Sequence, residues 1–398
     1  MRQQWGGMGG VWLLSLRHAL HHRVQTGILM FCIAISLYLP VTSHLLMSTY
    51  SDDLTARADS TPLIMGARGN RFDLTLGVLY FRQSSIDPIP LRVFEDLREE
   101  RPGVVIPMNT EYTARGYPIV GTSFDYFEVR QLTPAEGTLP RRTGDVVLGA
   151  RVADDLDLTA GDTLFSDQLE LYDIAVPPAL RMRITGVLEP SHAADDTAVF
   201  VDLNTIWVIA GAAHGHADVT QTGTVDERLI LGRGGGHTAV SPALIEYNEI
   251  TDDNIASFHV HGDRDQLPLS AVLVFPRDEK TRTMLKARIN AEGDWQMVVP
   301  GMVIDDLLAF VFRIKSLFDA LSVMLAGCTV LMTVLVVLLS MRVRAGEIRT
   351  LNRIGCARHT VAALYASELL IIFACSVSLA VLAIAGTMFW LPNLVRVL

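Results

Sequence analysis

Two histidine pairs with the spacing His-x-His are the residues of this sequence whose types and spacing best suit metal binding. One pair is His214 and His216, and the other is His259 and His261. Residues i and i+2 of a β-strand share one face, so such a pair can offer two imidazoles to one Zn²⁺ or Cu²⁺ ion. The alternative is that these four are solvent-exposed histidines in a loop and a strand, because the spacing alone has low specificity. Zinc binding at these residues is therefore a hypothesis.

A basic segment between two apolar runs is the second set of candidate functional residues. Residues 342–358 read RVRAGEIRTLNRIGCAR, with five arginines and a single acidic residue, Glu347. Lys and Arg are enriched in cytoplasmic loops next to membrane spans, so this segment is expected to lie at the cytoplasmic surface. From the segment alone, two interpretations stay open: the arginines only set the topology, or they also bind a partner.

The chain carries no recognisable catalytic motif. None of the patterns GxxxxGK[ST], GxSxG and HExxH occurs in its 398 residues. Its formal net charge is −10 at pH 7, which disfavours nucleic acid as a partner. We therefore expect no catalytic residues, no enzyme activity and no nucleic-acid binding.

Three uncharged apolar runs predict a membrane protein. Half of the residues are hydrophobic and the mean hydropathy is +0.32, too apolar for an ordinary soluble protein of this length. Residues 24–50, 320–341 and 369–395 contain no Asp, Glu, Lys or Arg, and each reaches the roughly 20 residues needed to cross a bilayer. The first run is longer than the apolar part of a typical signal peptide, which favours an uncleaved anchor. Pro40 within it predicts packing against neighbouring helices, which would satisfy the carbonyl that proline leaves without a donor.

The charges beside these runs set the expected topology. Arg2, Arg17 and Arg23 come before the first run without any acidic residue, so the N-terminus is expected to be cytoplasmic. The expected segments are a cytoplasmic interfacial helix at 1–23, transmembrane helix 1 at 24–50, an outer domain at 51–314, the end of a stalk with transmembrane helix 2 at 315–341, a cytoplasmic segment at 342–366 and transmembrane helix 3 at 367–395.

The large outer region is predicted to be a mixed α/β domain. Strands are expected at 74–81, 145–148, 180–188, 197–201 and 271–275, and helices at 91–100, 150–156 and 280–290. The strand-helix-strand-helix order of residues 271–308 is typical of a βαβ sandwich, whose other half would come from before a central insert. We predict a discontinuous, porter-like βαβ subdomain at 51–120 and 266–305, with a mostly β insert at 121–265.

Two further features of this region concern its connections. The stretch 212–236 is rich in Gly, Ala and His, which predicts a loop. From Val303 the apolar pattern becomes helical and continues through Ile314 and Leu317. One long helix is therefore expected to lead into the second span.

Several stretches together match the pattern of a known family. Residues 347–371 read EIRTLNRIGCARHTVAALYASELLI, in which Glu347, Leu351, Gly355 and Cys356 fit a pattern E-I-x-x-L-R-x-x-G-A/C, while Asn352 stands where the Arg would be. In the outer region the matching stretches are TSFDYFEVRQLTPAEGTLP, GDVVLGARVADDLDLTAGDTL, RMRITGVLEP and DDTAVFVDLNTIW. In order and spacing the chain resembles the FtsX/MacB-type permeases of ABC transporters, with a MacB-like periplasmic core domain.

The resemblance implies a partner subunit and a cellular location. It implies a separate cytoplasmic ABC ATPase subunit, which would hold the ATP and Mg²⁺, and a position in the inner membrane of a bacterium with the outer domain in the periplasm. It also implies a homodimer, contact with membrane lipid and a periplasmic protein or lipoprotein as a further partner. The ATPase-coupling residues would be Glu347, Arg349, Leu351, Arg353, Gly355 and Arg358.

The implied function is coupling of ATP hydrolysis to movement of the periplasmic domain. Such mechanotransmission would serve export or extraction of a lipoprotein, peptide or lipid, because the spans offer almost no charge for an aqueous path. Two alternatives are a zinc-handling component of a metal-uptake-linked ABC system and a membrane signalling scaffold without transport. The family usually has a fourth span, whereas this sequence ends just after the third, which indicates either a three-span subgroup or a truncated C-terminus.

Overall fold

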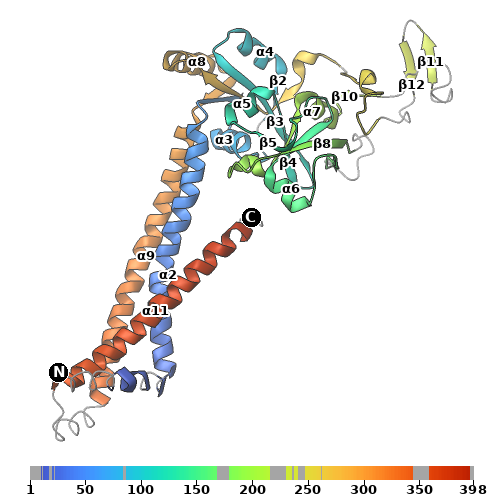
Figure 1. Ribbon diagram of the computed structural model, residues 1–398. Coiled ribbons are helices and arrows are strands. Elements are labelled where there is room, and N and C mark those ends of the chain that lie inside the picture. The colour runs from blue at the N-terminus through green and yellow to red at the C-terminus, as the bar shows by residue number, and fades with distance from the viewer. Residues whose placement is uncertain are drawn as a thin grey trace. The chain divides into compact units, whose positions relative to one another are not determined.

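The computed structural model describes most of the chain, namely residues 10, 12–17, 20–21, 23–83, 87–167, 179–215, 230–234, 237–240, 247–260, 262–343 and 358–394. These residues form two compact units (Figure 1). The membrane unit consists of Met1–Asp52 and Leu308–Leu398, and the α/β domain consists of Asp53–Leu307.

Three long helices confirm the predicted spans. They are α2 (Arg23–Asp59), α9 (Pro300–Val343) and α11 (Arg358–Leu394). The parts long and apolar enough to cross a membrane are Arg23–Ser48, Pro300–Leu335 and Ala366–Trp390. Many large apolar side chains on these helices are exposed, such as Leu382 and Phe389, as expected for surfaces that face lipid. The predicted long helix from Val303 into the second span is also confirmed, because α9 runs through it without a break.

Hydroxyl groups join the three helices within the membrane unit. Ser36 Oγ of α2 lies 2.8 Å from Thr329 Oγ1 of α9, and Tyr38 OH lies 2.9 Å from Thr387 Oγ1 of α11. Both contacts lie within one helical turn of Pro40, where the helix lacks a backbone donor. The residues beside the proline thus pack against neighbouring helices, as the sequence predicts.

The N-terminal segment contacts the third long helix. Residues 12–17 are helical, and the Ser15 side chain is fully buried. Its hydroxyl lies 2.6 Å from Ser367 Oγ and donates to the Leu364 carbonyl at 3.1 Å, both on α11.

One ten-stranded sheet forms the centre of the α/β domain. Its main path has the order β16-β1-β15-β3-β4-β9-β6-β8-β5, and β7 pairs with β8 beside it. The strands are β1 (Leu63–Ala67), β3 (Gly103–Ala114), β4 (Tyr117–Thr122), β5 (Pro134–Gly137), β6 (Asp145–Leu148), β7 (Thr163–Phe165), β8 (Arg181–Leu188), β9 (Val199–Asp202), β15 (Ala271–Pro276) and β16 (Trp295–Val298). The β4–β9 and β6–β8 pairs are parallel, and the other pairs are antiparallel.

Short strand pairs complete the described β structure. They are β2 (Ile89–Pro90) with β14 (Pro268–Leu269), β10 (Ala213–His214) with β13 (His259–Val260), and β11 (Ile230–Gly234) with β12 (His237–Val240). The prediction of a loop over 212–236 is therefore wrong at β10 and β11. The rest of that stretch from residue 216 to 229 lies outside the described residues.

Helices cover both faces of the sheet. Leu97 of α4 (Leu91–Glu99) and Ile289 of α8 (Glu279–Glu292) belong to the same buried cluster as Met65 of β1. On the other face lies α3 (Arg71–Leu79), because a Cβ placed on Gly66 would lie 2.5 Å from Leu74 Cδ1. The remaining helices are α5 (Phe124–Arg130), α6 (Ala150–Leu156) and α7 (Leu203–Ile209), with short 3₁₀ turns at Ala194–Thr197, Ile255–Ser257 and Arg264–Gln266.

The strand predicted at 74–81 is instead helix α3. Asn70 caps this helix, with its side chain accepting a hydrogen bond from the Phe72 amide at 3.0 Å. Asp73 lies in the first turn, where a negative charge favours the helix dipole. Leu74 and Val78, four residues apart, are both buried. The alternating apolar pattern misled the prediction because capping and packing outweigh intrinsic strand preference here.

The sheet also bears on the predicted division of the domain. Strand β3 pairs with β4, so the sheet continues across the expected boundary near residue 120. The division into a porter-like part and an insert remains a prediction, and the two parts share one sheet.

Candidate functional site

Most of the predicted ATPase-coupling residues cannot be placed. Glu347, Arg349, Leu351, Arg353 and Gly355 lie outside the described residues. Arg358, the sixth, is the first residue of α11. Their role stays a prediction.

A buried charge network holds the last turns of α2 inside the α/β domain. Arg57 is 7% exposed and Asp195 is 3% exposed at the side chain, and the two form a bidentate pair through Nη1 to Oδ2 and Nη2 to Oδ1. Arg57 Nε donates to the Leu79 carbonyl at the end of α3, and Nη2 donates to Tyr126 OH at 2.9 Å. Tyr126 OH in turn donates to Asp195 Oδ1 at 2.6 Å. Every polar atom of this pair therefore has a partner, which is what a buried ion pair requires.

Aromatic rings enclose this network. Phe81, Tyr126, Phe127 and Phe200 pack edge to face or tilted, with ring centroids 5.5 to 6.2 Å apart. The Arg57 guanidinium lies 5.3 Å from the centre of the Phe81 ring, a cation–π contact. Because both charged side chains are buried, their electrostatic attraction is stronger than that of an exposed pair.

The pKa directions follow from this environment. Burial opposes ionisation of Asp195, but the hydrogen bonds and positive charge of Arg57 outweigh it, and the pKa of Asp195 lies below its usual value. Burial also opposes the charge of Arg57, yet the oxygens of Tyr126 and Asp195 raise its pKa. Burial raises the pKa of the Tyr126 phenol. The network is therefore an ionised pair with a neutral phenol at neutral pH.

Arg130 of α5 ties the same region to the chain that follows α2. Its Nη1 donates to Ser60 Oγ at 2.6 Å and its Nη2 donates to Thr61 Oγ1. Burial lowers the pKa of this guanidinium. Two arginines thus fasten the end of α2 and its exit to the domain.

The start of α9 lies beside the end of α2 within the domain. A Cβ placed on Gly301 would lie 2.7 Å from Asp59 Oδ1, so the two helices approach closely at this point. Arg71 Nη2 forms an exposed ion pair with Asp306 Oδ2 at 3.0 Å, which links α3 to α9. The domain-side ends of both helices are therefore neighbours.

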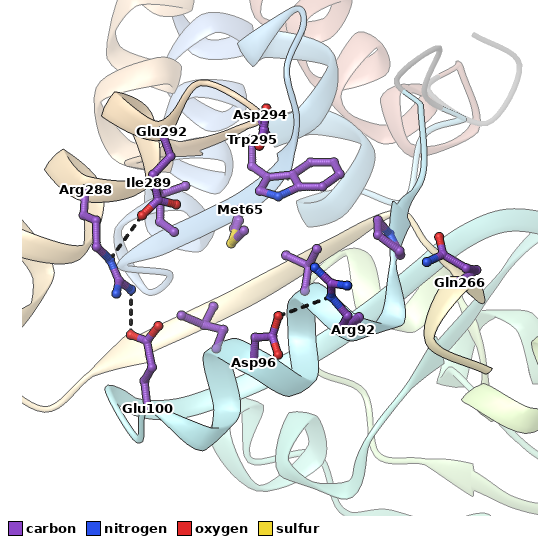
Figure 2. A pocket seen from close by; sticks show the side chains of 13 residues that line it. Met65, Arg92, Asp96, Glu100, Gln266, Arg288, Ile289, Glu292, Asp294 and Trp295 are labelled. Carbon is purple, nitrogen blue, oxygen red and sulfur yellow. Dashed lines mark hydrogen bonds and ion pairs between the residues drawn. The ribbon is translucent and has the colours of Figure 1, made fainter. Parts of the chain in front are cut away.

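A pocket of about 380 Å³ lies between α4, α8 and β16 (Figure 2). Its apolar lining includes Trp295 and Met65. Arg288 Nη2 of α8 lies 2.6 Å from Glu100 Oε2 at the end of α4, and Arg92 Nε lies 3.6 Å from Asp96 Oδ2 within α4. The other lining residues are Pro90, Val93, Leu97, Gln266, Ile289, Glu292 and Asp294. The lining thus combines an apolar floor with charged side chains, which is typical of sites that bind a small molecule.

Two of the four predicted metal-binding histidines meet in the structure. His214 of β10 and His259 of β13 are directly opposed partners, with ring centroids 5.3 Å apart. His216 and His261 lie outside the described residues. Within the described ranges, no three His, Cys, Asp or Glu side chains are grouped so that they could hold a metal ion.

Sequence reasoning missed the Arg57 network. Arg57 and Asp195 are 138 positions apart, and Asp195 opens the family-matching stretch DDTAVFVDLNTIW, whereas Arg57 lies in none of the matching stretches. The only local signal is a single arginine among acidic residues just after the first span. A cation at that place is expected to face solvent, and only the tertiary fold shows that it is buried.

Comparison with known proteins identifies the family. The family described as the MacB-like periplasmic core domain matches residues 26–228, just over half of the chain. None of the curated proteins matches.

Two solved structures are similar to the chain. The crystal structure of the periplasmic region of MacB from Actinobacillus actinomycetemcomitans is 11% identical with a TM-score of 0.35, covering 63% of this chain and 93% of that chain. The extracellular domain of the noncanonic ABC-type transporter YknZ from Gram-positive bacteria is 10% identical with a TM-score of 0.33, covering 59% of this chain and 98% of that chain. On the strength of the family match, the chain belongs to the MacB/FtsX-like permeases of ABC transporters.

Proposed function

We propose that this chain is a permease subunit that transmits movement, driven by a separate ABC ATPase, to its extracytoplasmic domain. The family places it among transport components and implies an ABC ATPase partner. We further propose that the movement serves export or extraction of a lipoprotein, peptide or lipid, and that the subunit works as a homodimer in the bacterial inner membrane.

The observation that carries this proposal is the continuity of two helices. α2 and α9 each contain an apolar span and also end, or begin, among residues of the α/β domain. A helix is stiff because its turns are hydrogen-bonded along the axis, so it can carry displacement in that direction. In α2 one such bond is missing at Pro40. The buried Arg57–Asp195 pair would keep the end of α2 from slipping in its site.

A pulldown with matched variants tests the ATPase partnership. The triple variant Arg349→Gln, Arg353→Gln and Arg358→Gln should lose co-purification with the ATPase, because docking would need these side chains. The control is Arg2→Gln, Arg17→Gln and Arg23→Gln, which removes the same charge from the N-terminal segment. Loss in both variants would indicate a bulk charge effect, and retention in the first would contradict docking at this segment.

Hydrogen exchange tests whether movement reaches the domain. In the complex with its ATPase, ATP should change amide exchange at residues 53–59 and 300–307 relative to ADP. Ile314→Pro, which interrupts α9 at a cost of about 3 kcal/mol or more, should abolish the change, whereas Ile314→Ala should preserve it. Identical exchange with both nucleotides in the unaltered protein would contradict mechanotransmission. Failure of the ATPase to bind at all would favour a signalling scaffold instead.

A further inference from the structure

The β10–β13 strand pair carries two imidazoles in a geometry that suits a metal ion. His214 and His259 are directly opposed in this antiparallel pair. Opposed residues of adjacent strands point to the same face. Ala213 is 6% exposed and belongs to the core. Successive side chains of a strand point to opposite faces, so the next residue, His214, lies on the outer face. His259 is exposed as well.

The separation of the two rings matches a shared ligand. With a Zn–N distance of about 2.0–2.1 Å, the centre of a bound imidazole lies about 3.2 Å from the metal. Two such rings at a tetrahedral angle then have centres about 5.2 Å apart. The observed distance between the ring centroids of His214 and His259 is 5.3 Å, with an angle of 60° between the ring planes.

The surroundings orient His259 as metal-binding histidines are usually oriented. Its Nδ1 lies 2.8 Å from the Ser257 carbonyl oxygen, which can only accept, so Nδ1 carries the proton. A metal ion would then bind at Nε2. Donation from the distal ring nitrogen to a backbone carbonyl is the common arrangement behind metal-ligating histidines, because it fixes the tautomer and raises basicity.

The backbone next to His214 is also held in place. A Cβ on Gly215 would lie 2.6 Å from the Phe258 ring, and the Gly215 carbonyl accepts from the Tyr247 amide at 2.9 Å. These contacts hold the backbone that carries the two rings, and a backbone already held in place loses less entropy on binding.

We propose that His214 and His259 bind a divalent cation of borderline softness, Zn²⁺ or Cu²⁺, on the outer face of the β10–β13 pair. Imidazole is a preferred ligand of both ions, and water completes the coordination shell. The ion would link the two ends of residues 215–258 and so stabilise the closed strand pair. This inference is independent of the ATPase partnership, because it concerns only the domain's own side chains.

Calorimetry on the full-length chain in detergent, with zinc chloride as the titrant, tests the proposal. The unaltered protein should bind zinc, and the heat should disappear in both His214→Ala and His259→Ala. His192→Ala is the matched control, since His192 is an exposed histidine elsewhere in the same domain. Absence of zinc binding by the unaltered protein, or full binding by both single variants, would overturn the proposal.

A second probe separates ligation from loss of folding. Cu²⁺ bound to the unaltered chain should show electron paramagnetic resonance couplings to two imidazole nitrogens, and each single variant should lose one. Both variants should retain the thermal unfolding temperature of the unaltered protein without metal, since both rings lie toward the surface. Zinc should raise that temperature only in the unaltered protein and in His192→Ala. An equal increase of the unfolding temperature in all four proteins would mean that zinc binds at other sites, and it would refute zinc binding by His214 and His259.

Discussion

The guanidinium of Arg57 shares its buried site with the carboxylate of Asp195 and the phenol of Tyr126. Replacing both charged partners and removing only one of them have very different effects on stability. The pair adds little net stability over a well-packed apolar replacement, but removal of one partner leaves the other charge without compensation. The contact is therefore most informative when only one side chain is changed.

Arg57→Met should destabilise the chain strongly. The methionine fills part of the volume but leaves Asp195 buried without its cation, at a cost of about 3–5 kcal/mol in the free energy of unfolding. Thermal unfolding of the full-length protein in detergent measures the loss. The control is Arg71→Met, which breaks the exposed pair with Asp306 and should cost less than about 1 kcal/mol. Similar losses of stability in both variants would mean that the buried pair is no more important for stability than the exposed pair.

Asp195 should also make stability depend on acid pH. Its folded pKa lies below the usual value of 3.8. The stability from its ionisation is therefore fully present above the unfolded value and is lost as the pH falls toward the folded value. The unfolding temperature of the unaltered protein should drop more steeply than that of Asp195→Asn once the pH passes below about 4. Parallel curves between pH 7 and 3 would contradict this.

Hydroxyl groups join the described long helices of the membrane unit to one another. Ser36 contacts Thr329 and Tyr38 contacts Thr387, so α2 is joined to both other long helices near Pro40. In lipid there is no hydrophobic drive between apolar helices, and such hydrogen bonds contribute to their association. The sequence predicted this packing from Pro40, but the partner residues could not be predicted without the bundle.

A double-mutant cycle on Ser36→Ala and Thr329→Ala should give a coupling energy of about 0.6 kcal/mol, and at most about 1.7 kcal/mol. Reversible unfolding in mixed detergent micelles provides the four free energies. Ser378→Ala is the control, because the Ser378 hydroxyl bonds only to the Ala374 carbonyl of its own helix among the hydrogen bonds described. If the coupling energy between Ser378 and Thr329 is as large as that between Ser36 and Thr329, the measured coupling does not report a direct contact between α2 and α9.

The elements that the sequence predicted well are those with strong local patterns. The helix at 91–100 and the strand at 180–188 appear as α4 and β8 within a residue or two. The strand predicted at 74–81 is wrong because apolar residues alternate there with Thr75 and Gly77, which is the pattern of a strand. The N-cap that favours helix α3 is a single polar residue upstream, Asn70. Pairing between distant strands, as in β10 with β13, has no local signal at all.

At the scale of the whole molecule, the sequence established the membrane class and the family, but not its key contacts. Long apolar runs and the ordered motifs of the outer region can be read locally. The Arg57–Asp195 pair and the opposition of His214 and His259 depend on tertiary folding, so the sequence could suggest the histidines by type only. The proposed ATPase partner comes from the resemblance to the family and from no contact in the structure.

The proposed topology makes a whole-molecule prediction. In a background where Cys32, Cys328, Cys356 and Cys375 are replaced by serine, Ser191→Cys should react with a membrane-impermeant maleimide in spheroplasts, because the domain would face outward. Gly10→Cys is its counterpart at the N-terminus, where a Cβ would meet open space. It should react only after the membrane is permeabilised. The reverse pattern would invert the assigned orientation.

If α9 transmits movement as proposed, its length would enlarge small rotations. At a rise of about 1.5 Å per residue, its 44 residues form a rod about 66 Å long. If the rod stays straight, a tilt of about 5° at one end displaces the other by about 6 Å, which is comparable to one full turn of a helix. Small rotations at one membrane surface could thus become displacements as wide as a side chain at the far end, without any large rearrangement inside the lipid.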